Sequence, residues 1–267
     1  MIPILISSAF NLDIYKTNTC SSFKNRLPRL TDALPPTSHR NRGFPTYSIA
    51  MTDFWYPSKV LNVSERGNEI TLVHIDKDDV IVKVSVQAKF YPTIQSLVDS
   101  VNLALKPHTR KHISFLNSDV TERTFMVFKK SSKFIVSLGR DLALILGFKA
   151  DTPYFASANE EFKIKSNFQS SVQGNLDHML IYCDAIEQSY MANELTNIFA
   201  MISRKYDQTR RSLHVPFENP VWHKLENGTN IESIQFTITD MSGQPFAFYD
   251  GVTTVGIQIK RDESNEN

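Results

Sequence analysis

The stretch VIVKVSVQAKF, residues 80–90, indicates the fold most clearly. Apolar side chains recur at every second position from Val80 to Phe90, and the positions between them, such as Lys83 and Lys89, are mostly polar. Successive side chains of a β-strand point to opposite faces, so this period of two predicts a strand with one buried and one solvated face. Antiparallel sheets commonly have one solvated face, and the stretch therefore favours an antiparallel sheet.

The sequence just before this stretch predicts the other half of a hairpin. Residues 70–75 have a second strand pattern, and the acidic segment 76–79 between the two supplies turn residues. Similar patterns predict further strands, of which 133–138 is expected to neighbour 123–129 across a short turn. The expected strands are residues 1–6, 47–56, 123–129, 133–138, 178–183, 233–238, 244–248 and 252–260.

Helical patterns interrupt this series of strands. Residues 94–105 carry an apolar stripe at helical spacing, and Pro107 is expected to end that helix. Residues 140–146 predict a second helix, which Gly147 would cap in a left-handed conformation. Residues 194–204 are a third candidate. Many short strands with two or three short helices in the loops predict an all-β sandwich, as one domain over 1–261 with a disordered polar tail at 262–267.

The composition argues against a dedicated nucleic-acid or membrane protein. Lys and Arg number 29 against 28 acidic residues, so the net charge of +1 gives no basic excess for nucleic acid. The apolar segment 1–6 contains Pro3 and is too short to insert in a membrane. The two cysteines do not form a disulfide framework, and Cys183 lies in an apolar run that predicts a buried, inert thiol.

No constellation in the sequence predicts catalysis or a cofactor. His108 and His112 have the i, i+4 spacing of zinc ligands, but Pro107 precedes them and no nearby Cys or carboxylate completes a site. No nucleophile elbow, P-loop or dinucleotide fingerprint occurs. Asp184 is interpreted as a strand-end carboxylate that accepts backbone N–H groups. We therefore expect no enzyme, with no catalytic residue, cofactor site or metal site.

Several segments, in order, resemble one family of capsid proteins. They are residues 14–28 (IYKTNTCSSFKNRLP), 47–57 (YSIAMTDFWYP) with Asn62 and Val63, Leu142 with residues 146–148 (LGF), 180–186 (LIYCDAI) and 234–261 with its Asp240-x-x-Gly243 turn. This series is similar to the minor capsid, or penton, protein of Polinton/Maverick (adintovirus-like) elements. Two departures are the long segment 29–45 and the sequence YMAN at 190–193, where the family has I-V-G.

The resemblance implies a single jelly-roll protein that assembles into homopentamers at the vertices of an icosahedral capsid. Its partners would be copies of itself and a separate double jelly-roll major capsid protein, without sequence-specific nucleic acid. It implies a virion location, after assembly in the cytoplasm or nucleus of the host cell. The family carries no catalytic residues that could be transferred to this chain.

Long loops at 29–45, 149–176 and 205–229 would supply the contact surfaces. The expected interface residues, each of which could also be ordinary core, are Phe44, Tyr154, Phe155, Phe168, Phe217 and Trp222. One alternative is a jelly-roll binding module for a receptor or carbohydrate, with Trp222 near Glu226 in its loops. Another is a cupin-like enzyme with a metal at His108 and His112.

Overall fold

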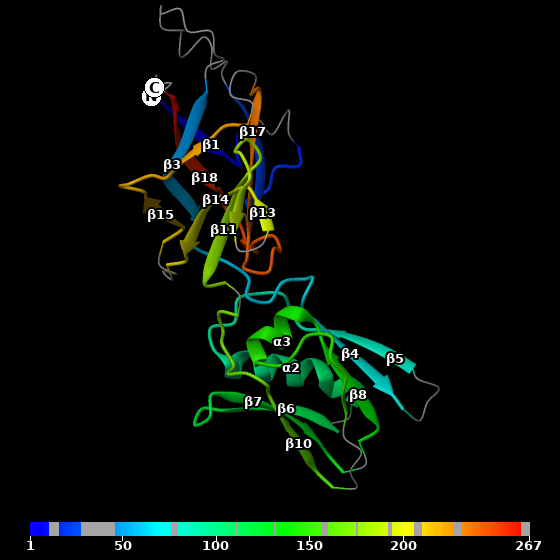
Figure 1. The fold of residues 1–267 in the computed structure, drawn as a ribbon. Helices are drawn as coiled ribbons and strands as arrows, with labels where there is room; N and C mark the ends of the chain where they lie inside the picture. The colour runs from blue at the N-terminus through cyan, green and yellow to red at the C-terminus, as the bar shows by residue number, and fades with distance from the viewer. Residues whose placement is uncertain are drawn as a thin grey trace, which may run out of the picture. The chain divides into compact units, whose positions relative to one another are not determined.

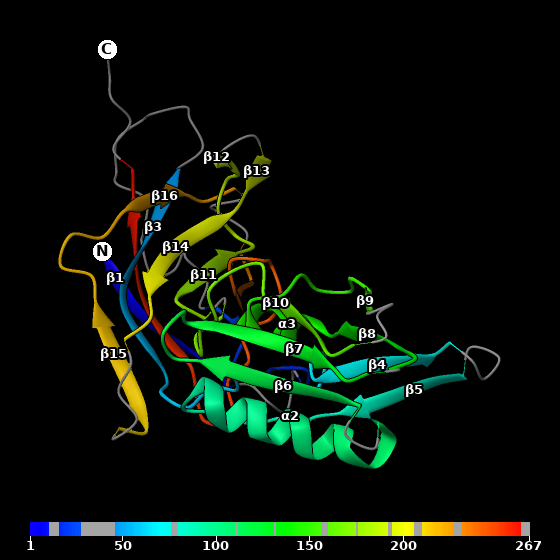
Figure 2. The ribbon, with the colours of Figure 1, turned by 90° about the horizontal axis from the view of Figure 1, so that it is seen from below.

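The structure is a computed structural model (Figures 1 and 2), and it is mostly antiparallel β-sheet with two helices among the described residues. It therefore confirms the predicted all-β class. The described residues are 1–10, 16–27, 46–75, 80–109, 112–130, 132–155, 160–174, 176–191, 194–205, 210–226 and 231–262. The chain divides into two compact units, one formed by Met1–Lys59 with Leu176–Asn267 and the other by Val60–Asn175.

The first unit contains two antiparallel sheets. One sheet has the order β1 (Ile2–Ser7), β18 (Thr254–Arg261), β3 (Tyr47–Pro57) and β15 (Ser212–Pro216), and β16 (Trp222–Lys224) also pairs with β3. The other has the order β14 (Ile198–Ser203), β11 (His178–Cys183), β17 (Ser233–Thr239) and β2 (Ser22–Arg26). A small hairpin of β12 (Ser189–Met191) and β13 (Glu194–Thr196) lies between β11 and β14 in the chain.

The pairing of these strands is that of a jelly roll. β15 and β16 pair with successive parts of β3 and together act as one interrupted sixth strand. In chain order the first strand then pairs with the eighth, the second with the seventh, the third with the sixth and the fourth with the fifth, always antiparallel. Such nested pairs, folded into two sheets, make a jelly roll. The jelly-roll prediction is therefore confirmed, and we call this part the jelly-roll unit.

A bulge in β3 keeps the inner face of the jelly-roll unit apolar. Ile49, Phe54 and Tyr56 are all fully buried, although an uninterrupted period of two would place Phe54 on the opposite face to Ile49. The register with β18 shifts between Gly256 and Ile257, so Thr52 is the extra residue on β3. One inserted residue reverses the faces, and the bulge therefore turns both ends of β3 toward the core.

Residues Val60–Asn175 form a second unit, which we call the inserted unit because it lies in the chain between β3 and β11. One sheet has the order β5 (Val80–Ser85), β4 (Glu69–His74), β8 (Phe134–Leu138) and β9 (Tyr154–Phe155). The other has the order β10 (Phe162–Lys165), β7 (Arg123–Phe128) and β6 (Ile113–Ser118). The helices are α2 (Ile94–Thr109) and α3 (Arg140–Leu146), so both predicted helices and the predicted hairpin of β4 and β5 are confirmed.

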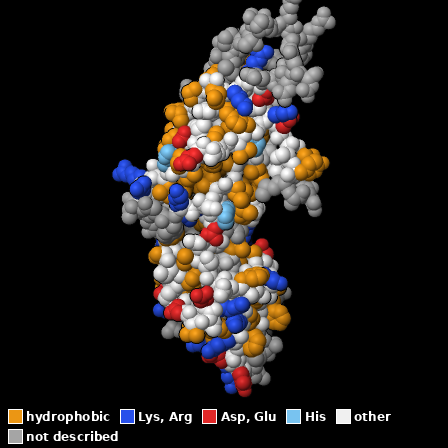
Figure 3. Space-filling view, turned by 60° about the vertical axis from the view of Figure 1, so that its left-hand side comes forward, with side chains coloured by type: hydrophobic (Ala, Val, Ile, Leu, Met, Phe, Trp, Pro, Cys, Tyr) orange, Lys and Arg blue, Asp and Glu red, His pale blue; other side chains and the backbone are white. Residues whose placement is uncertain are grey.

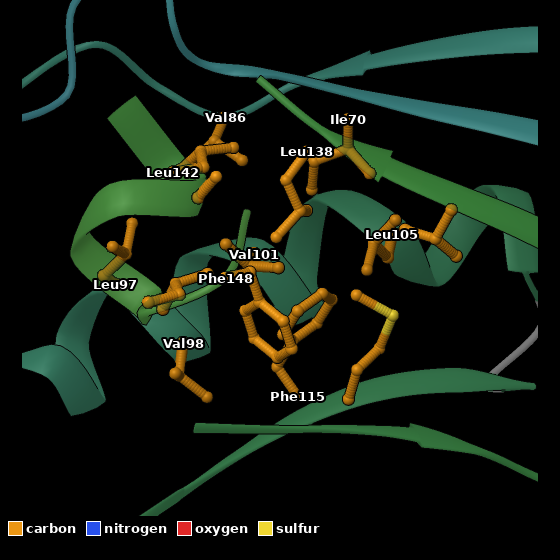
Figure 4. Packing of buried hydrophobic residues seen from close by; sticks show 14 of the residues in the cluster. Ile70, Val86, Leu97, Val98, Val101, Leu105, Phe115, Leu138, Leu142 and Phe148 are labelled. Carbon is orange, nitrogen blue, oxygen red and sulfur yellow. The ribbon is translucent and has the colours of Figure 1, made fainter. Parts of the chain in front are cut away.

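The core of the inserted unit is built around the predicted helical stripe (Figure 4). Leu97, Val101 and Leu105 of α2 are fully buried and belong to one cluster with side chains from both sheets and from α3. Phe115 and Phe148 meet edge to face, with ring centroids 6.1 Å apart. The cluster gives the inserted unit a hydrophobic core of its own.

A single domain over 1–261 stays a prediction, and within it the described residues form the two compact units named above. An inserted segment of this length can close around its own core, and the cluster of the inserted unit shows that residues 60–175 do so. Asp262, the first residue of the expected tail, donates its N–H to the Thr46 carbonyl (2.9 Å). Residues 263–267, the acidic turn 76–79 and the loop 29–45 lie outside the described residues.

Four local predictions were wrong. Residues 194–204 form β13 and β14 because pairing with β11 outweighs their helical pattern. α2 continues to Thr109 with Pro107 in its last turn, so the helix ends within one turn of the proline rather than before it. β8 pairs with β4 and β9, not with β7. Residues 244–248 form no strand, and Pro245 makes an isolated bridge with Thr239.

Candidate functional site

In the described part of the chain, the His, Cys and carboxylate side chains do not gather into a site for a metal ion. Among the described residues no group of three His, Cys, Asp or Glu side chains could hold a metal, and no helix there is long and apolar enough to cross a membrane. Cys183 is fully buried, and this burial raises the pKa of its thiol to about 12, as expected for an inert thiol. Asp184 accepts the Gln235 N–H (2.7 Å), which confirms its interpretation as a strand-end carboxylate, although burial raises its pKa.

One outer face of the jelly-roll unit carries both tryptophans of the chain. On β3 and β15, Trp55 stacks on His214 with ring centroids 4.5 Å apart and only 6° between the planes. On β16, Trp222 carries the Lys260 ammonium 4.3 Å from its ring centroid. Leu5 of β1 is 59% exposed on the same face. We call this surface, made by Leu5, Trp55, His214, Trp222 and Lys260, the tryptophan face.

A hydrogen bond and a glycine hold the tryptophan face in place. His214 Nε2 and Asp53 Oδ1 are 2.8 Å apart, so the imidazole is fixed between the carboxylate and the Trp55 ring. Gly256 lies opposite Asp53 in the β-ladder, and a Cβ there would come within 3.0 Å of the Asp53 Cβ. The missing side chain thus makes room for the carboxylate that orients His214.

The other sheet of the jelly-roll unit presents a second apolar surface. Met201 of the edge strand β14 is 55% exposed. In the adjoining hairpin, Tyr190 and Leu195 lie directly opposite each other, so they share one side, and they are 76% and 53% exposed. We call Tyr190, Leu195 and Met201 the hairpin surface. The outer faces of the two sheets point away from each other, so Met201 lies on the opposite side of the sandwich from the tryptophan face. The segment that leads into the hairpin is bridged to the residue after β16, Ile186 with Leu225.

Hydrophobic side chains are also visible over much of the jelly-roll unit in Figure 3, with charged side chains scattered between them. A surface of this kind, with large apolar groups on well-paired strands, is typical of protein–protein contacts. Aromatic side chains held rigidly in a sheet lose little conformational entropy when a partner covers them. The arrangement can therefore support binding between folded surfaces.

The predicted interface residues are distributed over both units. Tyr154 is buried in the core of the inserted unit, whereas Phe155 and Phe168 of that unit are 57% and 59% exposed. Phe217 and Trp222 are half-buried in the jelly-roll unit, and Phe44 lies outside the described residues. The long loops that were expected to carry them contain β9, β10, β15 and β16.

Sequence reasoning missed Trp55, His214, Tyr190 and Leu195. Trp55 follows the bulge at Thr52, so simple alternation within 47–57 could not show that it faces outward. Leu195 lies in the segment 194–204, whose pattern predicts a helix, and its partner Tyr190 lies just before that segment. A signal for the hairpin is present in the sequence, where the turn-forming residue Asn193 stands between Tyr190 and Leu195.

The chain can now be compared with known proteins. The chain is similar to a mavirus penton protein. Their alignment covers 98% of this chain and 99% of that one, with a TM-score of 0.44 and 11% sequence identity. The D1-D2-D3 domains of the flagellar cap protein FliD from Escherichia coli align over 91% of this chain and 58% of theirs, with a TM-score of 0.23 and 11% identity. No protein-family model and no curated protein matches the sequence.

Proposed function

We propose that the chain is a structural minor capsid protein of the penton type, which forms homopentamers at the vertices of an icosahedral capsid. The observation that carries the proposal is that one jelly roll bears two separate apolar surfaces, the tryptophan face and the hairpin surface. The ordered series of sequence motifs that resembles Polinton/Maverick minor capsid proteins also supports it. The protein would act by assembly, without catalysis, and reside in the virion.

The two surfaces suit a closed ring. A ring of identical chains needs a head-to-tail interface, in which one patch of a protomer contacts a different patch of the next. The tryptophan face supplies large rigid aromatic groups, and the hairpin surface supplies side chains on a short projecting element. We assign the ring contact to these two surfaces, with the hairpin surface of each protomer against the tryptophan face of its neighbour.

Charge does not oppose dense packing of the protomers. The formal net charge is +1, so neighbouring copies experience little long-range repulsion. The carbohydrate-binding alternative finds less support, because the Lys260 ammonium already occupies one face of the Trp222 ring on which a sugar would stack. The wider assembly would place the pentamer among copies of a double jelly-roll major capsid protein.

The test is the native mass of the purified chain, alone and after co-expression with such a major capsid protein. The proposal predicts the mass of five 30.5 kDa chains, or an integer multiple of it. Only monomers under all conditions would contradict it. Leu5→Asp on the tryptophan face and Tyr190→Asp on the hairpin surface should each abolish the five-fold species. Val120→Asp, at a position 95% exposed in the inserted unit, is the matched control and should leave it intact.

If two different surfaces form every contact in the ring, each single substitution disrupts one side of all the contacts. Both Leu5→Asp and Tyr190→Asp must therefore abolish the five-fold species. If Leu5→Asp abolished the five-fold species and Tyr190→Asp did not, the assignment of the hairpin surface would be wrong. The pentamer itself would survive that result, because the mass of the unmodified chain tests it separately.

A further inference from the structure

We propose that the inserted unit carries a second self-association site, at which β5 pairs edge to edge with β5 of another copy. The inference begins with the position of β5 in its sheet. In the order β5-β4-β8-β9 it is the outermost strand, and in the described part of the chain only β4 pairs with it. Its sequence VIVKVS has strong β-strand propensity, and Val80 and Ile81 are 50% and 65% exposed. Exposed apolar edges of this kind are templates for further strands.

The hydrogen-bond pattern shows which backbone groups point away from β4. Val86 donates its N–H to the Asn68 carbonyl (2.9 Å), one position beyond the Glu69–Ser85 pair that ends the ladder. In an antiparallel ladder every second residue bonds to a given neighbour. The even-numbered residues of β5 therefore bond to β4, and the N–H and C=O groups of Ile81, Lys83 and Ser85 point toward the outer edge.

An apolar row on the outer face of the same sheet ends at this edge. Ile81 lies opposite Val73, Val73 opposite Ile135, and Ile135 opposite Phe155, so one row crosses all four strands. The adjacent row on the other face, with Leu72 and Val136, is buried in the core. The outward row remains partly open, most of all at its two ends.

The occupant that fits the edge is a second copy of β5. When two copies of β5 pair about a two-fold axis, odd-numbered residues must lie opposite odd-numbered ones. Only the odd-numbered residues have N–H and C=O groups that point toward the outer edge. An axis at Lys83 would place two lysines opposite each other, which repel. An axis at Val82 instead places Ile81 opposite the partner subunit's Lys83, whose aliphatic stem can cover it.

This register also avoids unpaired charge at the junction. Lys83 is already paired with Glu69, with Nζ 3.1 Å from Oε2, so the two edges meet without a net excess of positive charge. The Ile81–Lys83 pairs form the hydrogen-bonded positions, and the two Val82 residues form the close pair without hydrogen bonds. The result is a continuous sheet of eight strands, four from each copy.

A proline substitution tests the hydrogen bonds of this junction. Lys83→Pro removes an N–H that points away from β4, so it keeps the internal ladder and deletes one donor per copy of the new one. Lys83→Ala is the matched control, because it removes the same side chain and keeps the N–H. In the Tyr190→Asp background, which blocks the proposed ring, we expect dimers that Lys83→Pro weakens on the order of tenfold or more, since two hydrogen bonds are lost.

Sedimentation equilibrium measures this association, and far-ultraviolet circular dichroism checks that both variants are folded. Equal association by Lys83→Pro and Lys83→Ala, or monomers in the Tyr190→Asp background at all concentrations, would overturn the proposal. If Lys83→Pro fails to fold, Ile81→Asp serves in its place, because it puts a carboxylate into the row without changing the backbone.

A cross-link tests the register independently of the ring. In a Cys20→Ser chain, Val82→Cys should form a disulfide between two copies, because residues in a close antiparallel pair have the separation that a disulfide requires. Val84→Cys is the control, as it does not lie opposite itself. A covalent dimer on a non-reducing gel with Val82→Cys alone is expected. Equal yields from both positions, or none from Val82→Cys, would contradict the register, whether or not the chain also forms pentamers.

Discussion

The jelly-roll unit and the inserted unit are made of similar strands but differ in how far along the chain their contacts reach. In the jelly-roll unit Ile2 pairs with Ile259, and Phe23 pairs with Phe236. In the inserted unit Glu69 pairs with Ser85, and β6 pairs with β7 across a short turn. Distant pairs require the closure of long loops before any contact forms, so we expect the jelly-roll unit to fold more slowly.

The two units therefore differ in how they can form and in the contacts that we assign to them. The inserted unit can form from a contiguous segment, whereas the jelly-roll unit is complete only when both ends of the chain have met. The two surfaces assigned to the ring lie on the jelly-roll unit, and the edge assigned to dimerisation lies on the inserted unit. Each unit can then be perturbed by itself, and each has its own spectroscopic probe.

The largest effect is expected from matched truncations in the two cores. Phe54 of β3 and Phe115 of β6 are both fully buried, so Phe54→Ala and Phe115→Ala should each lower the free energy of unfolding of its own unit by about 3–5 kcal/mol. Both tryptophans, Trp55 and Trp222, lie in the jelly-roll unit, and both described helices lie in the inserted unit. Tryptophan fluorescence and the helical circular dichroism signal therefore follow the two units separately during denaturation.

If the units are independent, Phe54→Ala shifts the fluorescence transition alone and Phe115→Ala shifts the helical transition alone. A common shift of both transitions by either variant would break the comparison, because it would mean that the two units unfold together.

A smaller difference is expected between two glycines with nearly the same positive φ. Gly147 has φ 77° and Gly243 has φ 79°. A Cβ at Gly147 would lie 2.3 Å from the Phe168 carbonyl oxygen, whereas nothing lies within 4 Å of one at Gly243. Gly243→Ala should destabilise the jelly-roll unit by about 1 kcal/mol through conformation alone. Gly147→Ala should destabilise the inserted unit by more than about 2 kcal/mol. Chemical denaturation with the two probes measures both, and equal effects would contradict the close packing at Gly147.

The free energy of unfolding of the jelly-roll unit should fall as the pH becomes acidic. The Nε2 atom of His223 is buried without a hydrogen-bond partner in the described structure. The centroid of the His223 ring lies 5.2 Å from that of the Phe199 ring. Burial lowers the pKa of His223, so the unfolded chain takes up the proton first as the pH falls below about 6.5. Stability is therefore full above that pH and declines below it.

His223→Gln should reduce the loss of stability of the jelly-roll unit between pH 7 and pH 5.5, measured by fluorescence-detected denaturation at each pH. The inserted unit is the internal control, because its transition should not respond to this substitution. An unchanged slope in the variant would show that His223 does not contribute to the decline.

The smallest effect concerns the reactivity of the two thiols. Cys183 is fully buried with a pKa of about 12, whereas Cys20 is partly exposed and donates to the Gly251 carbonyl (2.8 Å). A thiol reagent at pH 8 should modify only Cys20 in the native chain and reach Cys183 at the rate at which the jelly-roll unit opens. Phe115→Ala should leave the labelling of Cys183 unchanged. Faster labelling in that variant would couple the two units.

The same contrast explains how much the sequence could predict. The hairpin of β4 and β5, the stripe of α2 and the cap at Gly147 depend on neighbouring residues, and all three were predicted. The jelly-roll topology came from a resemblance between ordered motifs, because pairs such as Ile2 with Ile259 leave no local signal. The tryptophan face depended on one extra residue, Thr52, whose bulge appears only when β3 is paired with β18. Tyr154 and Phe155 were assigned together, although adjacent strand residues point to opposite faces.

The most direct test of the account is the native mass of a chain in which residues 60–175 are replaced by a flexible Gly/Ser linker. The jelly-roll unit contains both surfaces assigned to the ring, so this chain should still form a species of five copies. It should form no doubled species, because β5 is gone. A shortened chain that folds, as its tryptophan fluorescence would show, but stays monomeric while the full chain is five-fold would contradict the claim that the jelly roll alone builds the ring.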